Sequence, residues 1–259
     1  MKVIFHPRFY EVYTHDPAAA AGRMEAIVNA LKAEFEFVEP RPVSERDLER
    51  VHGRNHIQSV KRDPMVYEVG LLAAGGAILA AETAFEGQPA FGLIRPPGHH
   101  ASPHSCWGFC YFNNVAIGIK KLISEEKIKR ALILDFDLHY GDGTANTFSN
   151  SNEASYFHPE GTNRQAFLKE VEQALQSKTP YDIIAVSAGF DRHEEDWGGL
   201  LTTRDYLTIG KLVKEQSLIR CQGRRFGVLE GGYNHSVLGK NVKSFLRIFC
   251  LTKLILRQL

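Results

Sequence analysis

Short apolar runs alternate along the chain with longer amphipathic segments. The runs cover residues 3–5, 91–94, 131–134, 183–186 and 226–229. They are apolar at consecutive positions, which is typical of strands buried on both faces in a parallel sheet. A polar, Gly-rich turn follows most of them.

The segments between these runs have the period of amphipathic helices. One apolar face combines Met24, Ile27, Leu31 and Phe35, and similar faces lie within 167–175 and 206–213. Residues 68–85 are almost all apolar or small, which predicts a buried helix. Strand–helix alternation predicts a three-layer α/β/α fold around a mostly parallel sheet. With no repeat or linker, we expect a single domain over residues 1–259.

Composition and charge narrow the function classes. The chain is 44% hydrophobic and 24% charged, which excludes a disordered or disulfide-scaffold protein. Its formal net charge of +1 argues against a broad basic face for nucleic acid. No 18-residue apolar run or signal-peptide pattern is visible, and the four cysteines are unevenly spaced. We expect a cytoplasmic protein that binds neither nucleic acid nor membrane, and leave an oligomer open.

Chemistry-bearing residues follow four of the predicted strands. The segments are RPPGHH (95–100), DFDLHYGDG (135–143), SAGFD (187–191) and EGGYN (230–234). In open α/β sheets, ligands bind beyond the carboxyl ends of the strands. We therefore expect these four segments to converge on one site.

Two of the segments predict a metal site. Asp137 and His139 are two residues apart after a strand, so their side chains are expected on the same side. Asp191, after another strand, completes a set of two carboxylates and one imidazole. This set suits a divalent ion such as Zn²⁺, with one position left for water and substrate.

The remaining polar residues predict acid–base chemistry. His99 or His100 can take a proton from water and return it to a leaving amine. Asp135 and Asp142 are candidate partners that orient the two imidazoles. Asp135 has a second open interpretation, as a ligand of a monovalent ion. Tyr233 lies in a Gly-Gly turn and can donate to a carbonyl oxygen as negative charge develops there.

Five ordered blocks give the chain a clear family resemblance. RPPGHHA, GFCYFNN, DFDLHYGDGT, SAGFD and LEGGYN resemble the signatures of the histone deacetylase and acetylpolyamine amidohydrolase superfamily, closest to its class II and prokaryotic branch. The resemblance implies an arginase/deacetylase-like fold with about eight strands. It also implies a zinc-dependent amidohydrolase that removes acyl groups from N-acylated amines, such as acetyl-lysine, acetylpolyamines or small amides.

The resemblance also implies a role for each site residue. The zinc ligands would be Asp137, His139 and Asp191. His100, supported by Asp142, would be the main base and acid. His99, paired with Asp135, would supply mainly electrostatic stabilisation. Tyr233 would polarise the scissile carbonyl.

Further implied residues surround this centre. Gly108 and Phe109, within GFCYFNN, would line one wall of a substrate tunnel. A potassium ion would be held by Asp135 together with backbone carbonyls near Asp137 and His139. Arg23 would match an arginine near the floor of the site.

Departures from the family pattern leave alternatives open. The interval from Gly143 to Ala188 is short: only YFHPEGTNRQ (156–165) stands where relatives carry a longer loop that supplies the opposite tunnel wall. We therefore expect a wider, more open site. A catalytically silent acyl-amine binding protein is one alternative, and a binuclear-metal ureohydrolase is another. Residues 245–259, FLRIFCLTKLILRQL, are expected to form a final helix on the sheet, with an interaction surface as the alternative.

Overall fold

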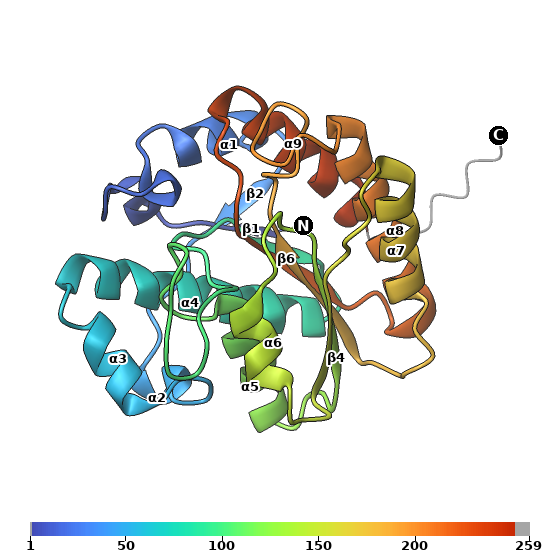
Figure 1. Cartoon of the computed structure of the whole chain (residues 1–259). Coiled ribbons are helices and arrows are strands. Elements are labelled where there is room, and N and C mark those ends of the chain that lie inside the picture. The colour runs from blue at the N-terminus through green and yellow to red at the C-terminus, as the bar shows by residue number, and fades with distance from the viewer. Residues whose placement is uncertain (1, 252–259) are drawn as a thin grey trace.

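A parallel sheet forms the centre of the computed structural model, which describes residues 2–251 (Figure 1). Within that range the sheet has seven strands, in the order β2-β1-β3-β7-β6-β4-β5, and every pairing is parallel. The strands are β1 (Lys2–Ile4), β2 (Glu36–Val38), β3 (Ala90–Gly92), β4 (Ala131–Asp135), β5 (Ala154–Phe157), β6 (Ile183–Ala188) and β7 (Arg225–Leu229). The predicted three-layer α/β fold is confirmed, with seven described strands against the expected eight or so.

The two strands that the sequence did not predict are the edges of the sheet. β2 and β5 contain no fully buried residue, whereas β3, β4, β6 and β7 are buried at every position. A search for doubly buried runs therefore finds the central strands and misses the edges. Those central strands carry the polar segments, so the error left the predicted site intact.

Helices cover both faces of the sheet (Figure 1). On one face lie α4 (Pro64–Phe85) and α5 (Asn114–Ser124), with α2 (Glu45–Leu48), α3 (Arg54–Val60) and α6 (Asp142–Phe148) beside them. On the other lie α1 (Arg23–Leu31), α7 (Arg164–Leu175), α8 (Thr203–Arg220) and α9 (His235–Phe249). Two 3-10 turns, η1 (Pro7–Tyr10) and η2 (Pro17–Ala19), follow β1.

Helix α4 is the apolar helix predicted at 68–85. It begins at Pro64, after Asp63 accepts a hydrogen bond from the Val66 N–H. By length and composition α4 could cross a membrane, but 67% of its most apolar window is buried. A Cβ on Gly75 would lie 1.9 Å from the Arg41 carbonyl oxygen. The glycine therefore lets α4 pack directly against the chain that follows β2.

The last described helix partly meets the expectation for the C-terminus. α9 is capped by the Asn234 side chain and packs against α8 and α1. It ends at Phe249, so it includes the start of the segment 245–259. Residues 252–259 lie outside the described range.

Candidate metal centre and catalytic pocket

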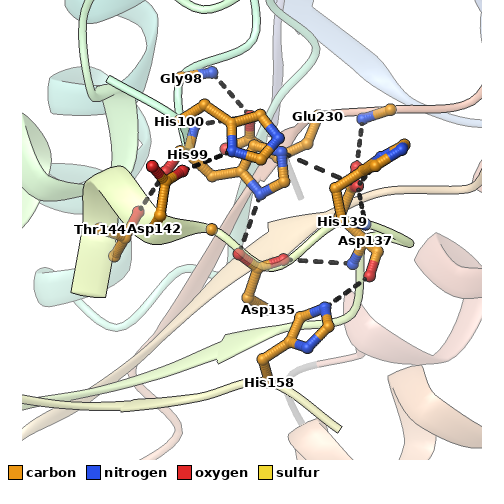
Figure 2. A network of polar contacts seen from close by, with 12 residues as sticks. Gly98, His99, His100, Asp135, Asp137, His139, Asp142, Thr144, His158 and Glu230 are labelled. Atoms are coloured by element: carbon orange, nitrogen blue, oxygen red, sulfur yellow. Dashed lines mark hydrogen bonds and ion pairs between the residues drawn. The ribbon is translucent and has the colours of Figure 1, made fainter. Parts of the chain in front are cut away.

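The carboxyl ends of the central strands lie side by side, so the polar segments that follow them meet at one edge of the sheet. In the register of the sheet Asp135 pairs with Ser187, and Ala188 pairs with Leu229. The residues that follow these positions therefore project from the same edge. Figure 2 shows the result: His99 and His100 lie beside Asp135, Asp137 and His139.

Asp137, His139 and Asp191 form a compact cluster of potential metal ligands. One ligand atom from each lies within 4.8 Å of the others. His139 Nδ1 is 3.3 Å from Asp137 Oδ1 and 3.4 Å from Asp191 Oδ2. Asp191 Oδ2 is buried and, within residues 2–251, has no partner in hydrogen-bonding geometry. A buried carboxylate oxygen without a partner is costly, so the cluster fits a divalent cation.

The pKa shifts of Asp191 and His139 also indicate that the cluster lacks positive charge. Burial raises the pKa of Asp191, and the neighbouring Asp137 raises it further. The adjacent carboxylates of Asp137 and Asp191 raise the pKa of His139 to about 10. The paired carboxylates therefore hold a proton on the imidazole that faces them. A bound divalent cation would compensate the charge of the carboxylates in place of that proton and leave the imidazole neutral.

The two adjacent histidines have separate carboxylate partners. His99 Nδ1 lies 3.1 Å from Asp135 Oδ2, and His100 Nδ1 lies 2.7 Å from Asp142 Oδ1. Burial alone would lower the pKa of His99, but Asp137 and Asp135 raise it well above its usual value. Burial and then the charge of His99 lower the pKa of His100. His100 is therefore the imidazole that stays neutral near pH 7.

Glu230 holds the backbone of this histidine pair, a role that sequence reasoning missed. Its buried Oε2 accepts the Gly98 N–H at 2.7 Å and the His99 N–H at 3.2 Å (Figure 2). Burial raises the pKa of Glu230 to about 7. The available signal was its position, since it opens the EGGYN segment after a buried strand.

Tyr233 reaches the site from the turn after β7. The Tyr233 ring stacks on Trp197 with centroids 4.0 Å apart and meets Phe109 edge-on at 6.3 Å. The guanidinium of Arg23, beneath the site, lies 5.5 Å from the centre of the same ring. Asp196 Oδ2 accepts the Tyr233 N–H at 2.8 Å. The tyrosine is thus fixed by contacts on both its ring and its backbone.

These residues enclose a cavity of about 120 Å³. Its lining comprises Pro97, His99, His100, Trp107, Gly108, Phe109, His139, Trp197, Gly231 and Tyr233. Gly108 and Phe109 both adopt left-handed backbone, with φ of 59° and 67°. A Cβ on Gly108 would lie 2.5 Å from His100 Cδ2, so glycine lets this wall approach the base closely.

A second aromatic side chain borders the cavity, although the segment expected to supply the opposite wall is short. Trp197 stands beside Tyr233, in the segment that follows Asp191. The Trp107 ring lies tilted over His100 with centroids 4.0 Å apart, and its Nε1–H donates to the Asp142 carboxylate. Neither indole stands out in the sequence as a site residue, because each is more than half exposed and lies in a loop.

Comparison with known proteins shows the family of this chain. The family model for the histone deacetylase domain matches residues 18–159 and 157–249. The chain belongs to the histone deacetylase family. It is 29% identical to a probable deacetylase of Methanothermobacter thermautotrophicus, over 95% of this chain and 89% of the relative. It is 28% identical to histone deacetylase HDA1 of Saccharomyces cerevisiae, over 90% of this chain and 38% of the relative.

A solved structure supports the fold of this deacetylase-family chain. The crystal structure of the HDA15 HD domain superposes with a TM-score of 0.80 at 22% identity, covering 96% of this chain and 90% of that one. The match to the family model confirms the predicted superfamily membership. Membership supports hydrolytic deacetylation in general, and the family is generally zinc-dependent.

The groups around Asp135 do not fit the potassium ion that the resemblance implies. The Asp137 carbonyl, one of the expected ligands, already contacts Arg192 Nε at 3.0 Å and His158 Nε2 at 2.9 Å. Asp135 Oδ2 is shared by His99 and the Tyr156 hydroxyl. Protein donors thus stand where the ion would need free oxygen lone pairs.

Proposed function

We propose that this chain is a zinc-dependent deacetylase acting on linear N-acyl amines. One observation carries the proposal. The cluster of Asp137, His139 and Asp191 lies at the same small cavity as His100, an imidazole whose pKa is lowered and whose Nδ1 is held by Asp142. Amide hydrolysis needs a group that polarises the carbonyl and a neutral base that accepts a proton from water, and this cluster and His100 can supply both.

The zinc would be held by Asp137, His139 and Asp191. When bound, it would supply Lewis acidity to an amide carbonyl and to water. His100 accepts a proton from water at Nε2, because its Nδ1 already faces Asp142. The water oxygen bonds to the carbonyl carbon as the C=O π bond opens onto its oxygen, and the C–N bond then breaks as His100 passes the proton to the departing amine nitrogen.

Two further groups support this transfer. Tyr233, at the wall of the cavity, donates its hydroxyl proton toward the carbonyl oxygen, where negative charge develops. Asp142 stabilises the protonated state of His100 through the contact at 2.7 Å. It also accepts a hydrogen bond from Trp107, which fixes the carboxylate from its other side.

The cavity also supports a substrate class. Phe109 and Trp197 flank Tyr233, and aromatic walls of this kind suit an apolar methylene chain. A volume of about 120 Å³ suits a small acyl group. We propose acetyl-lysine side chains, acetylpolyamines and related small amides as the substrates to screen.

The test is a product-release screen of the zinc-loaded chain on acetyl-lysine peptides and acetylpolyamines. We expect turnover that chelation abolishes and added zinc restores. In the Tyr233→Phe variant kcat should fall by about 10²- to 10³-fold, the usual effect of losing one such donor. Ligand binding without zinc-dependent turnover would show a silent binding protein. Two tightly bound divalent ions per chain would support a ureohydrolase instead.

A further inference from the structure

A buried arginine lies directly behind the metal-ligand loop. Arg192 follows Asp191 in the chain, and its side chain turns away from the cavity toward the segment after β4. Its Nε donates to the Asp137 carbonyl at 3.0 Å, and its Nη2 donates to the Leu138 carbonyl at 3.3 Å and to the Pro159 carbonyl at 3.2 Å. The residue is only 8% exposed. One guanidinium therefore gathers three backbone carbonyl oxygens.

His158, just after β5, completes the surroundings of the Asp137 carbonyl (Figure 2). Its Nε2 lies 2.9 Å from that oxygen and 3.2 Å from Arg192 Nη2. A lone pair on Nε2 would face the carbonyl oxygen at this distance, so the proton belongs on Nε2 and is donated to the carbonyl. Both lone pairs of the Asp137 carbonyl are then used, one by each residue.

Three protein donors contact the carboxylate of Asp135. Its Oδ2 accepts from the Tyr156 hydroxyl at 2.9 Å and faces His99 Nδ1, while its Oδ1 accepts the Asp137 N–H at 3.1 Å. The Tyr156 hydroxyl in turn accepts the Gly141 N–H at 2.8 Å. A monovalent cation would have to displace these donors and stand beside a guanidinium.

We propose that Arg192 is a built-in cation that takes the place of the potassium ion and positions the loop carrying Asp137 and His139. The guanidinium supplies one positive charge and directed donors to carbonyls that would otherwise coordinate an ion. It also stacks 4.8 Å from the centre of the Phe167 ring in α7, which fixes its own position. Arg192 thus ties the loops of two metal ligands together, because Asp191 is its neighbour in the chain.

The part of this inference that concerns catalysis rests on the proposed function. The part that concerns the ion does not, so the first readout is thermal unfolding of the full zinc-loaded chain. The midpoint Tm is compared in KCl and in choline chloride at matched ionic strength. We expect the two values to agree for the wild-type chain. A saturable rise in Tm with KCl would overturn the proposal, whether or not any acetylated substrate is turned over.

The second arm uses Arg192→Ala, which opens the carbonyl cluster to an ion. Without potassium we expect kcat to fall by about 10- to 100-fold, as is usual when a group supporting metal ligands is lost. KCl should restore most of that loss and raise Tm, whereas choline chloride should not. A variant that folds and shows no potassium response in either readout would contradict the assigned cation position.

Two matched variants separate this effect from general damage. Arg192→Lys keeps the charge, so its Tm and kcat should remain independent of potassium. If Arg192→Ala fails to fold, Arg192→Met replaces it as a variant that keeps the bulk of the side-chain stem. Arg164→Ala removes an arginine that is half exposed and paired with Asp205. It should show no potassium response, and a response there would assign the effect to the surface instead.

Discussion

Asp196 is predicted to control the activity of Tyr233 without touching the substrate. Its Oδ2 accepts the backbone N–H of Tyr233 and that of Asn234, each at 2.8 Å. The preceding Gly232 has a φ of 114°, so the turn adopts a backbone that needs external support. Asp196→Ala removes both hydrogen bonds and leaves the tyrosine side chain unchanged.

The size of the effect follows from these two bonds. Each hydrogen bond to a charged group contributes about 1.5–3 kcal/mol, and the lower value applies to the partly exposed Asp196. The two bonds together favour the turn that places Tyr233 at the cavity over a displaced turn by about 3 kcal/mol. Losing them reduces the population of the active turn, which corresponds to a fall in kcat of up to about 100-fold. The stack on Trp197 remains in the variant, so we expect a loss between about 10- and 100-fold.

A double-mutant cycle with Tyr233→Phe tests this reasoning. Since Asp196 acts through the tyrosine hydroxyl, Asp196→Ala should have little further effect on kcat in the Tyr233→Phe background. Glu195→Ala is the matched control, because this neighbouring carboxylate is exposed and does not contact the turn through its side chain. Steady-state kinetics of the zinc-loaded chain on an acetyl-lysine substrate supply the values. An equal fall in kcat in both backgrounds would refute the positioning role.

Two further predictions concern pH. The pKa of His100 is lowered by burial and by His99, so kcat/KM should stay constant until pH falls below about 6.5. Asp142→Asn removes a group that raises this pKa, so the acid limb of the kcat/KM profile should shift to still lower pH. A shift of that limb to higher pH would contradict the assignment of His100 as the base. Burial and then His56 lower the pKa of His52 to about 3. The unfolded chain therefore binds more protons at His52 than the folded chain, so stability falls as pH drops below about 6.5. Between about pH 7 and pH 5, the free energy of unfolding measured in urea should fall by about 2 kcal/mol more for the wild type than for His52→Gln. Equal falls in the two proteins would contradict the role assigned to His52.

The sequence was most informative where side chains are either fully buried or carry distinctive chemistry. β4 and β6 were found because every residue in them is buried, and the segments after them hold Asp137, His139 and Asp191. Asp135 and Asp142 could also be identified as candidate partners of the two histidines, whereas the family resemblance supplied which carboxylate pairs with which histidine. Edge strands lacked this signal, since half-exposed residues carry no continuous apolar run.

What the sequence could not predict depends on contacts between distant segments. Trp197 appears as an exposed loop residue, and only the fold places it against Tyr233. Arg192 resembles a surface charge beside a ligand, and its burial depends on carbonyls supplied by two other loops. The short segment before α7 appeared to be a loss of site structure. In the fold, that same segment brings His158 beneath the Asp137 carbonyl.

The charge balance of the centre explains why one guanidinium suffices. Three fully buried carboxylates lie here: Asp135, Asp137 and Asp191. Buried charges persist only when compensated, and a divalent ion with Arg192 supplies three positive charges. The negative charge of the nearby Glu230, whose pKa burial raises to about 7, is set against the positive charge of His99, whose pKa the carboxylates raise well above its usual value. A potassium ion in addition to Arg192 would leave the centre with excess positive charge. Replacing Arg192 by a neutral residue leaves one carboxylate uncompensated, and a single monovalent cation is what restores the balance.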